Sequence, residues 1–330
     1  MEGGRRKFVA LGLTALPALA SAPRLLMAQS KFPERPIRFV VPYPPGGVYD
    51  AIARQWAEKA KATLGSVVVE NIGGVGGALG TAAVARAQRD GHTILLGSPL
   101  INLVNSVAMS RPLFDPKDLE PISILATSTF ALAVHPAVPA QTLQEFIAYA
   151  KANRGKLSYG SSGVGSPNHL AGEMFKWLVG VPEIVHVPYR GMGPALTDVV
   201  GGQIQLVPVS VTGQVLDFHR SGKLRILAVT SPARLAAAAQ VPTAAEAGVP
   251  AMIALQVIGL FAPAGTPKAI IDQISQATRS ATADPEYRQR LLASGFELPS
   301  DTSPQKMRQV IEEEYARWTP VLKAIDLKLD

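Results

Sequence analysis

The sequence predicts an α/β protein of two similar lobes, each a mostly parallel sheet flanked by helices, joined by two crossover strands. Short apolar runs alternate with segments of helical period, which is typical of parallel β–α–β units. The same alternation resumes after Pro139, so the plan occurs twice. Two unbroken apolar stretches, residues 122–136 and 252–265, are too long for simple edge strands and are interpreted as the crossovers.

The first lobe is predicted to begin with a strand and to alternate from there. Its expected strands are residues 37–41, 66–70 and 93–97, and its expected helices are 51–64 and 80–89. Within 51–64, Ile52, Trp56 and Ala60 recur at the helical period, which indicates one face buried against the sheet.

The second lobe repeats this order. Its expected helices are residues 143–153, 167–179 and 194–200, and its expected strands are 157–160, 184–187 and 203–208. We expect the hinge near 127–133 and 256–261. Lobe one then consists of residues 33–128 plus 258–330, and lobe two of residues 129–257.

Residues 1–28 are predicted to be an export signal rather than part of the fold. Arg5, Arg6 and Lys7 form a basic segment, and an apolar run from Phe8 to Ala20 follows that is too short to span a bilayer. Cleavage is expected after Ala28, although Ala20 and Ala22 also fit. A Sec and a twin-arginine signal both remain open, and we expect a periplasmic protein.

Charge and cysteine content exclude several function classes. The formal net charge of +7 falls to +4 without residues 1–28, and basic residues are not interleaved with aromatic ones, so a nucleic-acid partner is not expected. The chain has no cysteine, which excludes disulfides, thiolate metal sites and a cysteine nucleophile. We expect no cofactor and no metal.

A loop rich in proline and glycine, residues 42–47, connects the first predicted strand to the first helix. The amides of Gly46, Gly47, Val48 and Tyr49 have no partners within the helix and lie at the positive end of its dipole, which favours an anion. An alternative remains equally open: the loop is a tight turn, and Asp50 in the first helical turn interacts with the dipole itself.

A second loop, residues 160–165, repeats the strand–glycine–helix plan. Ser166 is the expected N-cap and Pro167 the first helical residue. Loops at the carboxyl ends of parallel strands on two facing lobes can close on one small anion. Ser161 and Ser162 add hydroxyl groups, and His169 either donates to a carboxylate or only satisfies the cap.

A third loop, around Arg190, precedes the helix at 194–200. Arg190 is a candidate carboxylate clamp, although an exposed or structurally paired arginine is the commoner outcome. The candidate ligand-binding residues are Tyr43, Gly46, Gly47, Val48, Asp50, Ser98, Ser161, Ser162, Gly165, His169, Tyr189 and Arg190.

Seven motifs in order resemble the tripartite tricarboxylate transporter receptor family, the Bug-type periplasmic solute-binding proteins. The motifs are PIRFVVPYPPGGVYDAIAR, VVVENIGGVGGALG, LSYGSSGVGSPNHLAGEMFK, VHVPYRGMGPAL, GKLRILAVT, VPTAAEAGVP and FAPAGTPKAI. The resemblance covers residues 32–325. It implies a two-lobed, type II-like periplasmic binding protein that closes on a small carboxylate and hands it to a membrane permease. A monomer is expected.

Three departures from the family pattern concern the ligand rather than the fold. The usual NRPGAGG is NIGGVGG here, Gln205 replaces an acid, and Val257-Ile258 replaces Trp-Phe in the second crossover. We expect these changes to reshape the cleft, with room for a bulkier or less charged ligand.

An exported enzyme acting on a small carboxylate is the alternative function. The glycine loop at 73–80 has Leu79 in place of the third glycine of a dinucleotide site, and Ser162 lacks the spacing of a nucleophile elbow. The five histidines form no metal-binding pair beside a carboxylate. The residues therefore favour a receptor.

Overall fold

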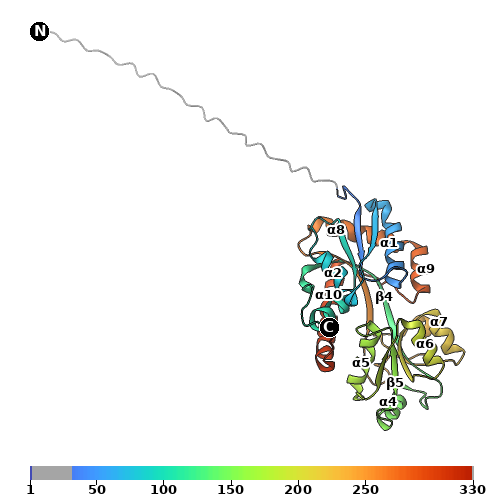
Figure 1. Ribbon diagram of the computed structural model, residues 1–330. Helices are drawn as coiled ribbons and strands as arrows, with labels where there is room; N and C mark the ends of the chain where they lie inside the picture. Colours follow the sequence, from blue (N-terminus) through green and yellow to red (C-terminus); the bar gives the residue numbers. More distant parts are fainter. Residues whose placement is uncertain (2–31, 329–330) are drawn as a thin grey trace. The chain divides into compact units, whose positions relative to one another are not determined.

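The computed structural model describes Met1 and residues 32–328 (Figure 1). Apart from Met1, the predicted export signal at residues 1–28 lies outside the described residues. Pro33–Asp330 forms one compact unit, and every element below belongs to it.

Lobe one is built on three parallel strands in the order β2-β1-β3. The strands are β1 (Ile37–Val41), β2 (Val67–Asn71) and β3 (Thr93–Gly97). Helix α1 (Val48–Leu64) connects β1 to β2, and the 3-10 turn η1 (Val75–Gly77) with α2 (Ala78–Ala85) connects β2 to β3. Strand β3 leads into α3 (Pro99–Val107). Because β1 lies between β2 and β3, the chain reverses its winding direction there, and ligands in open α/β sheets bind at such a switch point.

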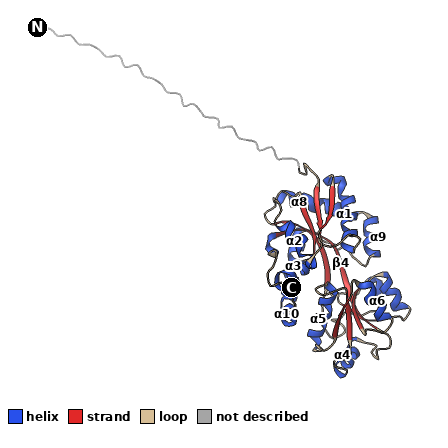
Figure 2. Cartoon of the chain, in the orientation of Figure 1, coloured by secondary structure: helices blue, strands red, loops and turns tan. Residues whose placement is uncertain are grey.

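Two long antiparallel strands connect the lobes (Figure 2). The turn η2 (Pro116–Asp118) leads into β4 (Leu119–Val134), whose first part pairs with β9 (Leu255–Pro263). The second part of β4 pairs with β7 (Leu206–Ser210) and β8 (Arg225–Val229) in lobe two. The predicted crossovers are therefore observed as β4 and β9.

Lobe two has a second parallel group in the order β7-β5-β6. Its remaining elements are β5 (Ser158–Ser161), β6 (Val185–Pro188), α4 (Leu143–Ala152), α5 (Pro167–Val179), α6 (Met192–Val200), α7 (Gly213–Arg220) and the turn η3 (Ala236–Ala238). The chain then returns through β9 to α8 (Lys268–Ala283), α9 (Pro285–Ala293) and α10 (Pro304–Ile325).

Most predicted elements occur close to their expected bounds, and β1, β3 and α5 match them. The strand expected at 203–208 instead begins at Leu206, because the Gln203 amide closes the preceding helix by donating to the Asp198 carbonyl. Sequence analysis assigned no elements to α3, β8 or α7–α10.

The C-terminal helix α10 contributes to the core of both lobes. Met307, near its start, packs in a cluster with Val40 and Phe261 of lobe one. Trp318, near its end, belongs to the cluster that contains Phe146 of lobe two. The helix packs against α3, β4 and α5, which come from both predicted lobes. The predicted lobe boundaries themselves stay a prediction.

Candidate functional site

The loop between β1 and α1 leaves most of its amides open. Gly47 is the N-cap of α1 and no side chain caps the helix there. The amides of Gly47, Val48 and Tyr49 have no hydrogen-bond acceptor within residues 32–328. Gly46 has a φ of +82°, a conformation that favours glycine, which explains why the chain has glycine at this point of the turn.

The carboxylate of Asp50 stabilises this loop through hydrogen bonds. One of its oxygens, Oδ2, accepts hydrogen bonds from the Gly46 amide at 3.0 Å and from Arg54 Nε at 2.9 Å. The Arg54 guanidinium, assisted by the Gly46 amide, lowers the pKa of the buried Asp50 carboxyl to about 2. Gly46 is thus the one amide of the predicted four that is already occupied. These contacts favour the turn-capping interpretation of Asp50.

Two tyrosines pack beside this loop. The rings of Tyr43 and Tyr49 lie 4.6 Å apart, and Gln256 Nε2 of the crossover strand β9 donates to Tyr49 Oη at 3.4 Å. Burial raises the pKa of Tyr49, while hydrogen bonds with Gln256 and the buried Ser98 lower it. The Tyr49 amide was part of the predicted anion site, whereas the Tyr49 ring and Gln256 were not predicted as site residues. A polar residue inside an apolar crossover was the available signal for Gln256.

The loop between β5 and α5 is stabilised by hydrogen bonds from its own side chains and from neighbouring histidines. Ser161 is fully buried, and its Oγ lies 2.7 Å from His186 Nε2. His169 Nδ1 accepts the Gly165 amide at 3.1 Å, and burial together with the neighbouring His186 lowers the pKa of His169 to about 4. His169 is therefore a neutral imidazole that accepts a hydrogen bond from the loop backbone. Ser161 is buried inside lobe two.

Asn168, which sequence analysis missed, is the polar centre of this loop. Its Oδ1 accepts from Ser162 Oγ and Ser166 Oγ, both at 2.8 Å, and from the Ser162 amide at 3.4 Å. These donors fix the orientation of the amide group. Its Nδ2 has only the thioether sulfur of Met192 at 3.8 Å, a weak acceptor, although Asn168 is only 5% exposed.

The third loop carries two predicted binding residues, Tyr189 and Arg190, and only Tyr189 forms a hydrogen bond within the described fold. Tyr189 Oη donates to Asp198 Oδ2 at 2.6 Å, and burial, reinforced by Asp198, raises the pKa of Tyr189 to about 12. Arg190 is exposed, and no ion pair or hydrogen bond joins it to any residue of the described chain. Gly191 is the N-cap of α6, with no side-chain cap, so the Met192 and Gly193 amides stay open within the same described part.

A pocket of about 400 Å³ lies where the N-termini of α1, α5, α6 and α7 meet. We call it the interlobe pocket, because Val48 and Phe296 come from lobe one and Ser162 from lobe two. Its lining residues are Val48, Phe130, Ser162, Pro167, Asn168, Met192, Gly193, Leu196, Val209, Ser210, Thr212, Gln214, Val215, Gln256, Ser294 and Phe296. Of the predicted site residues, the pocket brings together Val48 and Ser162.

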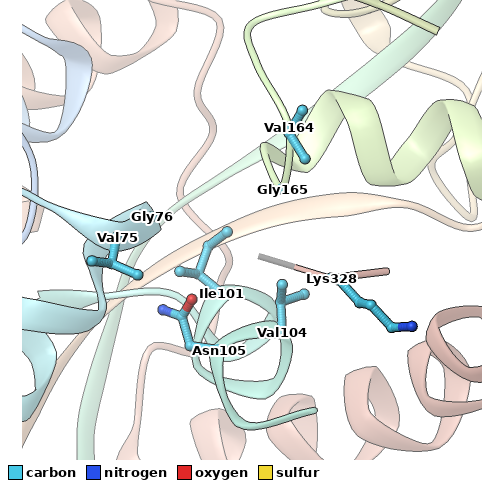
Figure 3. Close-up of a pocket in the computed structure, with 8 residues that line it drawn as sticks. All are labelled: Val75, Gly76, Ile101, Val104, Asn105, Val164, Gly165 and Lys328. Carbon is cyan, nitrogen blue, oxygen red and sulfur yellow. The ribbon is translucent and has the colours of Figure 1, made fainter. Parts of the chain in front are cut away.

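A second pocket, of about 320 Å³, involves other predicted loops (Figure 3). Val75 and Gly76 of η1 lie on one side and Val164 and Gly165 on another, with α3 beneath them. Val75 has a φ of +49°, which is an unusual conformation for a β-branched residue and indicates local strain. The family departure at residues 71–77 therefore affects this second pocket, whereas Gln205, Val257 and Ile258 line neither pocket.

Metal and membrane features are absent from the part of the chain that the structure describes. Over residues 32–328, no three His, Asp or Glu side chains gather closely enough to hold a metal ion. No described helix is long and apolar enough to cross a membrane.

Comparison with known proteins identifies the family. Residues 52–327 match the model of the tripartite tricarboxylate transporter family receptor. Protein BugT of Bordetella pertussis is 33% identical over 327 residues, which cover 98% of this chain and 98% of BugT. The chain belongs to this receptor family, whose members are periplasmic binding proteins.

Three solved structures share the fold. The periplasmic binding protein BugD is 33% identical, with a TM-score of 0.73 and coverage of 90% of this chain and 99% of BugD. MatC from Rhodopseudomonas palustris with bound malate is 30% identical, with a TM-score of 0.74 and coverage of 88% of this chain and 100% of MatC. An R. palustris protein with adipate is 33% identical (TM-score 0.74; 88% and 97% covered). These matches confirm the predicted two-lobed, type II-like periplasmic binding protein fold.

Proposed function

We propose that this protein is an extracytoplasmic solute receptor that captures a small organic carboxylate in the interlobe pocket. It closes on the ligand by bending at β4 and β9 and delivers it, as a monomer, to the permease subunits of a tripartite transporter. The observation that carries the proposal is that two uncapped helix N-termini, those of α1 and α6, border one pocket together with the Asn168 amide.

The electrostatics of the pocket favour an anion. Open amides at a helix N-terminus carry a partial positive charge and donate hydrogen bonds to carboxylates. The start of α1 at Val48 and the start of α6 at Met192 and Gly193 both line the pocket. Asn168 Nδ2 has a proton to donate and only a sulfur atom to receive it. The malate and adipate bound by the two R. palustris proteins support this ligand chemistry.

An enzyme that acts on the carboxylate is the alternative, and one contact favours testing it. Ser161 and His186 form a serine–histidine hydrogen bond. Ser161, however, is fully buried and lines neither the interlobe nor the second pocket. The nearby acid Glu173 is engaged by Tyr159 Oη and Lys176. We therefore assign the pair to the support of the β5–α5 loop.

A thermal-shift screen of the mature protein tests the receptor function. Ligand present at about 100 times its dissociation constant adds about 2.7 kcal/mol to the free energy of unfolding. We expect carboxylates, and not nucleotides or uncharged sugars, to raise the melting temperature. The hit is then incubated with the protein and quantified by chromatography; its consumption would establish an enzyme instead.

Export is tested separately by expressing the full chain in a Gram-negative host. We expect the protein in the periplasmic fraction, shorter by about 28 residues than the encoded chain. Retention in the cytoplasm at full length would contradict the proposed location. Replacing Arg5 and Arg6 together by Lys distinguishes the two export routes, because only a twin-arginine signal requires both arginines.

A further inference from the structure

We infer that the preferred ligand of the interlobe pocket is a monocarboxylate with a compact apolar body, such as a ring acid, rather than a di- or tricarboxylate. This inference rests on the proposed function and narrows it. It follows from how charge, open donors and apolar surface are distributed around the pocket.

No formally charged side chain lines the pocket. Among the lining residues, all of which belong to the described chain, there is no Lys, Arg, His, Asp or Glu. A carboxylate in this pocket must therefore be stabilised by amides and neutral side chains alone. Burying a second carboxylate without a countercharge is strongly unfavourable.

The open backbone donors of the pocket belong to two of the four helices that begin there. α5 and α7 are capped by Ser166 and Thr212, whose hydroxyls accept the His169 and Val215 amides. α1 and α6 have glycine N-caps and no side-chain cap. The donors available to a ligand thus include the first amides of α1 and α6 and Asn168 Nδ2, beside the side chains of Ser210 and Gln214, which also line the pocket.

One more hydroxyl lies on the strand face beside this group. Ser128 pairs with Gln256 across β4 and β9, and alternation along β4 puts Ser128 on the same face as Phe130. Phe130 and Gln256 line the pocket. Ser128 is 2% exposed and its Oγ has no hydrogen-bond partner in residues 32–328, although Ser128 does not itself line the pocket.

A part of the chain's core forms the apolar side of the pocket. Phe130, Leu196, Val209, Val215 and Phe296 line it, and all five are buried in the fold. They come from β4, α6, β7, α7 and the segment after α9. A ligand body that covers this wall gains by removing apolar surface from water, whereas a second carboxylate placed there loses its hydration.

The test compares ligands of similar size by titration calorimetry on the mature full chain. The panel contains benzoate and cyclohexanecarboxylate, the dicarboxylates adipate and malate, the tricarboxylate citrate, and the uncharged benzamide. We expect the ring monocarboxylates to bind at least tenfold more tightly than the dicarboxylates. Tighter or equal binding of adipate, malate or citrate would overturn the inference while leaving the carboxylate receptor in place.

Two other outcomes address the proposed function itself. Binding of benzamide as tight as that of benzoate would overturn both the inference and the carboxylate receptor. Failure of every acid in the panel to bind would do the same. The failure of the narrower inference is therefore distinguishable from the failure of the broader proposal.

A gain-of-function variant tests the missing countercharge directly. Gln214 lines the pocket and is exposed, so Gln214→Arg adds a guanidinium without burying it in the core. We expect adipate affinity to rise at least tenfold and the melting temperature to stay within a few degrees. Gln203→Arg, at an exposed position outside the pocket, is the matched control. Unchanged adipate affinity in Gln214→Arg would contradict the inference that the lack of a positively charged side chain in the pocket disfavours dicarboxylates.

Discussion

The two glycine loops that face the interlobe pocket look alike in sequence and differ in what they offer a ligand. In the β1–α1 loop, Asp50 accepts the Gly46 amide, and the first amides of the helix remain open. In the β5–α5 loop, Ser166 caps the helix by accepting the His169 amide, and the loop presents the amide side chain of Asn168 to the pocket. A glycine-rich turn before a helix therefore does not by itself define an anion site. The side chain at the N-cap decides whether the amides are free.

The strongest test of this difference is Asn168→Asp. The carboxylate still accepts from Ser162 and Ser166 but replaces the Nδ2 donor by a negative charge beside the ligand. We expect carboxylate affinity to fall at least a hundredfold, or about 2.7 kcal/mol or more. Calorimetry measures the affinity. Asn153→Asp, at the C-terminal end of α4, is the control for an equal charge change elsewhere in lobe two.

Gly47→Val tests the lobe-one loop. Gly47 has a φ of −81°, and an added Cβ meets only the Pro44 carbonyl oxygen at 3.7 Å, so folding should tolerate the substitution. The side chain would crowd the open amides, and we expect affinity to fall about tenfold to a hundredfold, or about 1.4 to 2.7 kcal/mol. The positive φ of this turn belongs to Gly46 and not to Gly47. Unchanged affinity in Gly47→Val would make the loop only a turn.

Asp50→Asn separates stability from binding. The pKa of Asp50 is lowered to about 2, so its contribution is present above the unfolded pKa near 4 and is lost as pH falls toward 2. Because Arg54 is half exposed, we expect a loss of about 1 to 2 kcal/mol at pH 7. Urea unfolding at pH 7 and pH 2.5 measures it, and the difference from the parent should shrink at the lower pH. A change in ligand preference instead would place Asp50 in the cleft.

Ser162→Ala should have the smallest effect of the four. Ser162 Oγ donates its proton to Asn168 Oδ1, so it positions the asparagine rather than donating to the ligand. We expect a threefold to tenfold loss of affinity, about 0.6 to 1.4 kcal/mol. A loss of a hundredfold in calorimetry would instead indicate a direct hydrogen bond to the carboxylate.

Sequence periodicity predicted the alternating elements because each has one face buried against a sheet. It assigned nothing to α7–α10, although α8 has residues such as Ile271 and Ile274 on its buried side. In the site, Val48 and Ser162 were predicted from turn chemistry. Asn168 was not, because its role depends on which side chains donate to its Oδ1, and a serine two positions before it predicts only a helix cap.

The C-terminal helix gives the hinge a third connection besides β4 and β9. Because α10 packs against α3 of lobe one and α5 of lobe two, wide separation of the lobes would require it to leave one of these packing partners. A receptor that populates its open form heavily weakens its apparent affinity in proportion to the fraction that is not competent to bind. We expect α10, by opposing wide opening, to keep that fraction small and so to limit the loss of apparent affinity.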